Sequence, residues 1–210
     1  MTALVVIAKA PLAGRSKTRL TPPCTPEQAA ALAGAALADT LAAVAATPAQ
    51  RRVVVLDGEP GAWLPAGLEV IAQRGGGLGE RLAAAFLDVG GPALIVGMDT
   101  PQLTPALLAQ ALAELRGADA VLGAAPDGGY WAIGLRRADD AVFAGVPMSE
   151  PTTCAVQRER LCALGLQTRE LPALRDVDEI DDALAVAALA PDTRFARALA
   201  AMDLGALAVA

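Results

Sequence analysis

Four cationic side chains follow the first apolar run of the sequence. Lys9, Arg15, Lys17 and Arg19 lie within eleven residues, in a chain whose net charge is -6. Lysine and arginine bind phosphate oxygens, and arginine does so with a planar fork. Gly14 lies among them and allows the backbone close to a ligand. We expect Lys9, Gly14, Arg15, Lys17 and Arg19 to bind the phosphates of a nucleotide; the alternative is a charged surface turn.

Carboxylates follow later apolar runs. Asp99 stands in "GMDTPQLT", and Asp176 and Asp178 stand in "DVDEIDD". At spacing i, i+2 in extended backbone, the last two side chains point the same way. We expect Asp99, Asp176 and Asp178 to bind a metal ion. The alternative is that they cap helices, as acids favour a helix N-terminus.

The sequence contains no histidine, which restricts the chemistry. Serine–histidine and cysteine–histidine nucleophile systems are excluded, as are histidine metal sites. A metal would bind oxygen ligands, which favours Mg²⁺ or Mn²⁺. A general base would be a carboxylate, a lysine or a tyrosine. Cys24, Cys154 and Cys162 show no C-x-x-C spacing and read as free thiols.

Two glycine-containing stretches are candidates for the rest of the site. "PDGGYW" places Asp127 and Tyr130 at the wall of an acceptor pocket, or forms only a hairpin turn. "QRGGGLGERL" opens a helix and can approach a ligand with backbone N–H groups, so we assign Gly79 and Glu80 to nucleotide binding.

Continuous apolar runs alternate with helical segments, which predicts strands buried on both faces. The predicted strands are 4–8, 52–57, 68–72, 93–98, 120–124 and 129–135. The predicted helices are 26–46, 78–89, 105–115, 151–163, 180–190 and 191–210. This order indicates a three-layer α/β/α fold with a mostly parallel sheet. Ligands of such sheets bind beyond the carboxyl ends of the strands, where the cations and carboxylates above are found.

Composition limits the class of protein. The 210 residues fit a single domain, 1–210, and 54% hydrophobic residues allow a sizeable core. A pI near 4.7 argues against nucleic-acid binding. The sequence shows no signal peptide, and its apolar runs are too short to span a membrane. We therefore expect a cytoplasmic protein.

The motifs "AKAPLAGRSKTRL", "LGERLAAAF", "GMDTPQLT", "LGAAPDGGYWAIGL" and "DVDEIDD" resemble those of the DUF2064 family over residues 3–190. That family, often labelled rSAM/selenodomain-associated transferase 1, is similar to the CofC-type guanylyltransferases, which activate phospholactate or phosphoenolpyruvate. The resemblance implies the nucleotide-diphospho-sugar transferase (GT-A) fold. It also implies phosphate binding by the Lys9–Arg19 loop and metal binding by Asp99, Asp176 and Asp178. The chain departs from the family pattern at Gly77 and at Met148-Ser149-Glu150.

Three functions remain open. The favoured one is nucleotidyl transfer from a nucleoside triphosphate to a phosphorylated small molecule, with Lys17 and Arg19 stabilising the departing pyrophosphate. The second is glycosyl transfer from a nucleotide sugar to a small acceptor, with Asp127 as the base. The third is a nucleotide sensor without catalysis. A homodimer is compatible with each.

Overall fold

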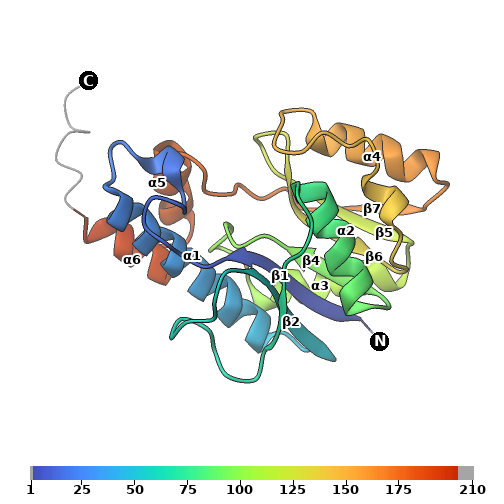
Figure 1. The fold of residues 1–210 in the computed structure, drawn as a ribbon, viewed down its shortest axis with the longest axis horizontal. Helices are drawn as coiled ribbons and strands as arrows, with labels where there is room; N and C mark the ends of the chain where they lie inside the picture. The colour runs from blue at the N-terminus through green and yellow to red at the C-terminus, as the bar shows by residue number, and fades with distance from the viewer. Residues whose placement is uncertain (1, 203–210) are drawn as a thin grey trace.

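The computed structural model describes residues 2–202 and has the α/β architecture predicted from the sequence (Figure 1). Within these residues, seven strands form one sheet in the order β3-β2-β1-β4-β6-β5-β7. The strands are β1 (Ala3–Lys9), β2 (Arg51–Asp57), β3 (Glu69–Ala72), β4 (Ala93–Val96), β5 (Ala120–Ala124), β6 (Tyr130–Leu135) and β7 (Thr168–Leu171).

All neighbouring pairs are parallel except those that involve β6. This strand runs antiparallel to β4 on one side and to β5 on the other. The "PDGG" segment therefore is a hairpin turn between β5 and β6, as one of the two sequence interpretations held. Because β5 and β6 are connected so tightly, the turn lies at the carboxyl end of β5, at the same sheet edge as the ends of β1 and β4.

Helices cover both faces of the sheet. They are α1 (Pro26–Ala46), α2 (Leu78–Val89), α3 (Pro105–Arg116), α4 (Thr153–Ala163), α5 (Ile180–Leu189) and α6 (Arg194–Ala200), with short 3₁₀ turns η1 (Thr18–Leu20) and η2 (Asp140–Phe143). Leu4 and Val6 of β1 pack with α1 and α3 on one face. Val5 packs on the other face in a cluster with α2, η2 and α4. The alternation along β1 thus separates two apolar cores.

A third cluster joins α1, α5, α6 and η1 at one end of the molecule (Figure 1). Leu20 and Phe195 are fully buried there. Because Leu20 ends the cationic loop, burying it attaches that loop to α1. The same cluster buries Val177, so the "DVD" segment is fixed to the same scaffold.

Helix α1 is long and apolar enough to cross a membrane, with a mean hydropathy of 1.7 over its most apolar window. A core helix passes the same test, and 56% of that window is buried inside the protein. Leu37 and Leu41 lie against the sheet, and the helix also contacts α3 and α6. We therefore describe α1 as a core helix.

Two parts of the predicted order needed correction. The sequence analysis did not predict β7, and it predicted one helix over 191–210. Within the described residues that stretch forms only α6, and 203–210 lie outside them. The predicted bounds of α2 match the structure.

Candidate functional site

The candidate site lies at the point where the order of strands reverses. From β1 the chain proceeds to β2 and β3 on one side, then returns to β4 on the other side of β1. The connections after β1 and β4 consequently diverge and leave a crevice, which is where open α/β sheets bind ligands. A cleft of about 950 Å³ opens here. A cleft of this size can hold a nucleotide together with a small second substrate.

The cationic loop after β1 has a fixed backbone. Its amides at Arg15 and Ser16 both donate to the carbonyl of Leu12, at 3.1 and 3.0 Å. The buried Ser16 hydroxyl accepts from the Leu12 amide at 3.0 Å and donates to the Ala10 carbonyl at 3.3 Å. The loop is thus held by its own hydrogen bonds, independently of a ligand.

Lys17 is the most enclosed cation of this loop. Its backbone adopts a left-handed conformation, φ 49° and ψ 44°, which is uncommon for a residue other than glycine. Its ammonium lies 3.0 Å from Asp99 Oδ2 and 2.9 Å from Asp178 Oδ1, and its side chain is only 10% exposed. Burial acts to lower the pKa of Lys17, but the two carboxylates outweigh it and raise the pKa, so the group is an ammonium at neutral pH.

The acidic segment "DVD" is attached to the loop that follows β4. The amide of Val177 donates to the carbonyl of Asp99 at 2.9 Å, which sets the two acidic stretches side by side. Asp178 forms ion pairs through both carboxylate oxygens. Its Oδ1 pairs with Lys17, and its Oδ2 lies 2.9 Å from Arg19 Nη1. Burial acts to raise the pKa of Asp178, but the charges of Lys17 and Arg19 leave it below its ordinary value.

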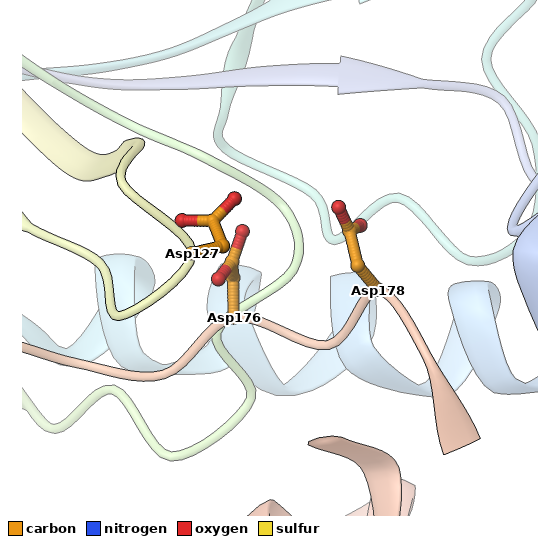
Figure 2. A group of neighbouring side chains, drawn as sticks. All are labelled: Asp127, Asp176 and Asp178. Atoms are coloured by element: carbon orange, nitrogen blue, oxygen red, sulfur yellow. The ribbon is translucent and has the colours of Figure 1, made fainter. Parts of the chain in front are cut away.

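Three carboxylates converge on a space suited to a cation. Each of Asp127, Asp176 and Asp178 has a ligand oxygen within 4.8 Å of the others. Figure 2 shows Asp176 and Asp178 rising in the same direction from one extended segment, as their spacing predicted, with Asp127 beside Asp176. Burial, followed by the charges of Asp127 and Asp178, raises the pKa of Asp176 to about 6. Such crowding of like charges is what a bound cation would relieve.

The residues present fit a hard divalent cation. Every candidate donor is a carboxylate oxygen, the ligand type that Mg²⁺ and Mn²⁺ prefer. Asp99 Oδ1 is buried and has no hydrogen-bond partner among the described residues. The arrangement differs from the predicted set, because Asp127 rather than Asp99 completes the cluster with Asp176 and Asp178. Asp99 is connected to Asp178 through Lys17 instead.

The hairpin turn that carries Asp127 is tightly constrained. Gly129 N–H donates to Asp127 Oδ1 at 2.8 Å. Gly128 has φ +91°, and a Cβ added to it would lie 1.9 Å from the carbonyl oxygen of Pro151. Only glycine fits at this position, and the close contact fixes the turn against the start of α4. Asp127 is therefore held at the cleft by the close packing of the turn against Pro151 as well as by its hydrogen bond.

The structure brings most of the predicted site residues together. The cleft is lined by Lys9, Arg15, Lys17, Arg19, Asp99, Asp127, Asp176 and Asp178. Gly14 has φ +72°, as a tight turn requires, but it does not line the cleft. Gly79 and Glu80 line a separate cavity beside α2, where Glu80 accepts a hydrogen bond from the Gly76 amide at 2.7 Å. Because Gly79 and Glu80 lie outside the cleft, their position does not support the prediction that they bind the nucleotide.

Arg81 is a cleft cation that the sequence analysis did not single out. It lies in the first turn of α2, two residues after Gly79, and its guanidinium is 3.3 Å from Asp57 Oδ2. The sequence contained a signal for it, because "LGERL" places a cation one residue after Glu80, turned about 100° around the helix axis from it.

A further part of the cleft lining comes from β6, from the segment before α4 and from the first residue of α4. Tyr130, Met148, Ser149, Glu150 and Thr153 line it. None of these is a cation, whereas Lys9, Arg15, Lys17, Arg19 and Arg81 line the remainder. Burial raises the pKa of Tyr130, so its hydroxyl stays protonated at neutral pH. Ser149 has φ 62°, a strained backbone of the kind that gathers at binding sites.

A family model described as "Uncharacterized protein conserved in bacteria (DUF2064)" matches residues 29–150. The chain belongs to this family. No curated protein matches its sequence. A DUF2064 membership agrees with the resemblance drawn from the motifs, of which "LGERLAAAF", "GMDTPQLT" and "LGAAPDGGYWAIGL" fall inside the matched residues.

Solved structures share the fold of this DUF2064 protein. A Desulfovibrio desulfuricans protein, provisionally described as a nucleotide-diphospho-sugar transferase, is 27% identical with a TM-score of 0.85, over 95% of this chain and 94% of its own. CMP:2-keto-3-deoxy-manno-octonic acid synthetase in complex with CTP is 14% identical with a TM-score of 0.57, over 90% and 97%. Mycobacterium tuberculosis Rv0371c in complex with manganese is 20% identical with a TM-score of 0.53, over 88% and 96%. The fold is that of the nucleotide-diphospho-sugar transferases, and these likenesses group the protein with the transferases.

Proposed function

We propose that the protein is a metal-dependent nucleotidyltransferase, which moves a nucleotidyl group from a nucleoside triphosphate to a phosphorylated small molecule and releases pyrophosphate. The observation that carries the proposal is the pairing of Lys17 with Asp99 and Asp178 inside one cleft. That pairing sets a phosphate-binding loop directly against a cluster of carboxylates. A metal-bound triphosphate needs both, because cations hold the phosphate oxygens and carboxylates hold the metal.

The metal would be Mg²⁺ or Mn²⁺, held by Asp127, Asp176 and Asp178 with Asp99 beside them. A bound divalent cation supplies positive charge at the reacting phosphate and at the leaving group. Two structural relatives support this assignment, since one is a complex with CTP and another a complex with manganese. Both likenesses are of fold, so the nucleobase and the ion are part of the proposal.

The roles of the cations follow from their positions. Lys17, Arg15 and Arg19 would hold the β and γ phosphates, and their contacts would strengthen as negative charge develops on pyrophosphate. The locked backbone of the loop favours this role, because preorganised donors need no rearrangement during the reaction. Lys9 and Arg81 line the same cleft and add positive charge to it.

The acceptor would attack without a general base. A phosphate acceptor is already ionised at neutral pH, so no proton must be removed. The site agrees with this, because Lys17 and Tyr130 both have raised pKa values and stay protonated. Histidine is absent from the chain. The remaining bases are the cleft carboxylates, and the proposal assigns those to the metal.

Glycosyl transfer from a nucleotide sugar is the second candidate. It is favoured by the description of the Desulfovibrio desulfuricans relative as a nucleotide-diphospho-sugar transferase. In that reaction Asp127 would act as the base toward an acceptor hydroxyl. It has a carboxylate oxygen within 4.8 Å of oxygens of Asp176 and Asp178, which makes metal binding the better role for it.

The test separates the two reactions by their products. The purified protein is incubated with each nucleoside triphosphate, and separately with common nucleotide sugars, in the presence of Mg²⁺ or Mn²⁺ and a metabolite extract. Release of pyrophosphate from a triphosphate supports the proposal. Release of a nucleoside diphosphate from a nucleotide sugar, without pyrophosphate in any incubation, would replace it with the second candidate. We expect the protein to act in the cytoplasm, on small molecules.

A further inference from the structure

Lys17 lies between two carboxylates of the cleft, and one of them, Asp178, belongs to the candidate metal cluster. Its ammonium lies between Asp99 Oδ2 and Asp178 Oδ1, at 3.0 and 2.9 Å. The side chain is almost enclosed, and the left-handed backbone at Lys17 directs the chain into η1 at this point. An ammonium at this spacing balances the negative charge that would otherwise repel across the gap.

The two carboxylates differ in their partners, and Asp99 has an oxygen left over for a second ligand. Asp99 Oδ1 is buried without a donor among residues 2–202, although Oδ2 of the same group is paired. Asp178 has both oxygens paired, one with Lys17 and one with Arg19. A divalent ion that used Asp178 would thus compete directly with Lys17.

We propose that Lys17 is an exchangeable internal counter-ion. In the nucleotide-free protein it forms ion pairs with Asp99 and Asp178 and weakens the binding of free divalent metal. When metal and triphosphate arrive together, the metal takes over the carboxylates and the ammonium turns to the phosphate oxygens. This inference rests on the proposed function and adds to it an order of events: metal alone binds weakly, and the triphosphate makes metal binding strong.

The move of the Lys17 ammonium from the carboxylates to the phosphates leaves no group without a charged partner. Lysine carries its charge on a flexible four-carbon stem, so the ammonium can move while the backbone of the loop stays locked. The charge that it leaves behind is replaced by the metal, and the charge that it meets is supplied by phosphate. Each ligand therefore removes an obstacle to the other, which is positive coupling between two sites.

The test measures metal binding alone, so it does not depend on turnover. Free Mn²⁺ is titrated into the metal-free protein and followed by electron paramagnetic resonance or calorimetry. Lys17→Met removes the ammonium and keeps the length of the side chain. We expect it to tighten Mn²⁺ binding by about tenfold, which corresponds to about 1.4 kcal/mol. An unchanged or weakened affinity would overturn the inference.

Lys9→Met is the matched control. Lys9 lines the same cleft and makes no ion pair within the described residues, so this variant removes the same charge from the cleft without touching Asp99 or Asp178. We expect a change in Mn²⁺ affinity of less than about twofold, because a charge that is exposed to water is screened. If Mn²⁺ affinity rose equally in both variants, the cause would be the loss of any positive charge from the cleft, and the inference would be overturned.

A second measurement on the unaltered protein covers the case in which Lys17→Met does not fold. Lys9 and Lys17 are the two lysines of the chain, so lysine-selective isotope labelling gives two side-chain sets of signals in NMR. We expect saturating Mg²⁺ to shift the Lys17 Cε signals toward those of the exposed Lys9. Unmoved Lys17 signals at saturating Mg²⁺ would overturn the inference. Pyrophosphate release, measured separately, decides the proposed function whichever way the metal titration turns out.

Discussion

Asp39 lies on α1 and Asp99 lines the cleft, and the two aspartates differ in how many of their oxygens have hydrogen-bond partners. Asp39 is buried on α1 and accepts hydrogen bonds from the amides of Arg194 and Phe195, at 3.1 and 2.8 Å. The Arg194 guanidinium also forms an ion pair with Asp39, with 3.2 Å between Nη1 and Oδ1. Asp99 has one oxygen paired with Lys17 and the other buried without a donor in the described part of the chain.

The difference separates a carboxylate that serves the fold from one that is prepared for a ligand. Asp39 meets the N-terminal amides of α6 and fastens that helix to α1, where unpaired amides would otherwise be costly. Asp99 leaves acceptor capacity unused at a cleft, where a ligand can supply the missing partner. An unsatisfied buried polar group is rare in a native structure and calls for such an explanation.

The largest effect is expected on the reaction, from Lys17→Ala. Losing one preorganised cation at developing charge should cost about 2–4 kcal/mol of transition-state stabilisation, which lowers kcat about thirtyfold to a thousandfold. Arg19→Lys should also slow the reaction, because one ammonium cannot reproduce a planar fork. The rate is measured by pyrophosphate release, with circular dichroism as the control for folding. A folded Lys17→Ala variant with the wild-type rate would show that the loop is a charged surface turn without a role in the reaction.

Asp39→Ala tests the structural side of the comparison. Two helix amides and a guanidinium lose their acceptor, so the free energy of unfolding should fall by about 2–3 kcal/mol. Urea denaturation measures it. The variant should keep the wild-type kcat at temperatures where it remains folded, because Asp39 lies outside the cleft. Loss of kcat with unchanged stability would erase the distinction between the two aspartates.

Asp99→Asn tests the binding side. Losing the negative charge next to Lys17 and the metal should weaken triphosphate binding in Mg²⁺ by about tenfold, or about 1.4 kcal/mol. EDTA should cause a similar loss in the wild-type protein and little further loss in the variant. Calorimetry measures both. If neither EDTA nor the substitution changes triphosphate affinity, Asp99 has no part in metal binding.

Asp176→Asn should stabilise the metal-free protein, by about 1 kcal/mol at pH 7.5. The pKa of Asp176 is raised to about 6 in the folded protein from 3.8, so its ionisation opposes folding. Below pH 4 the carboxyl is protonated in both states and the gain vanishes; it grows between pH 4 and 6 and is complete above. The expected gain is small because the Asp176 side chain is partly exposed to water, which screens the charges around it. Thermal unfolding in EDTA across this pH range measures it, and a gain that persists below pH 4 would assign it to another cause.

Much of the fold could be predicted because its signals are local. Thr25 and Gln28 form a capping box at the start of α1, with reciprocal hydrogen bonds of 3.2 and 2.8 Å, and its Thr-x-x-Gln pattern can be read directly from the sequence. Strand β7 gave no such signal, since "TREL" is short, mostly exposed and charged, and pairs only at the sheet edge with β5. Its strand conformation comes from tertiary pairing, which overrides local propensity.

The sequence predicted which residues line the site, but it did not predict which of them contact one another. The expected carboxylates all line one cleft, because strand ends meet at one sheet edge. The role of Asp127 beside Asp176 depends on the tight turn between β5 and β6, which the sequence left open between a hairpin and the wall of an acceptor pocket. The pairing of Lys17 with Asp99 joins residues far apart in sequence, and only the folded chain brings them into contact.

The most direct test of the central claim follows which bond of the triphosphate breaks. The protein is incubated with Mg²⁺, a metabolite extract and a triphosphate that carries a radiolabel in either the α or the γ phosphate. We expect the α label to move into a new acceptor conjugate and the γ label to appear in pyrophosphate, with both products formed about thirtyfold to a thousandfold more slowly in Lys17→Ala. A γ label found in orthophosphate or in the acceptor, with the α label retained in a nucleoside diphosphate, would contradict nucleotidyl transfer.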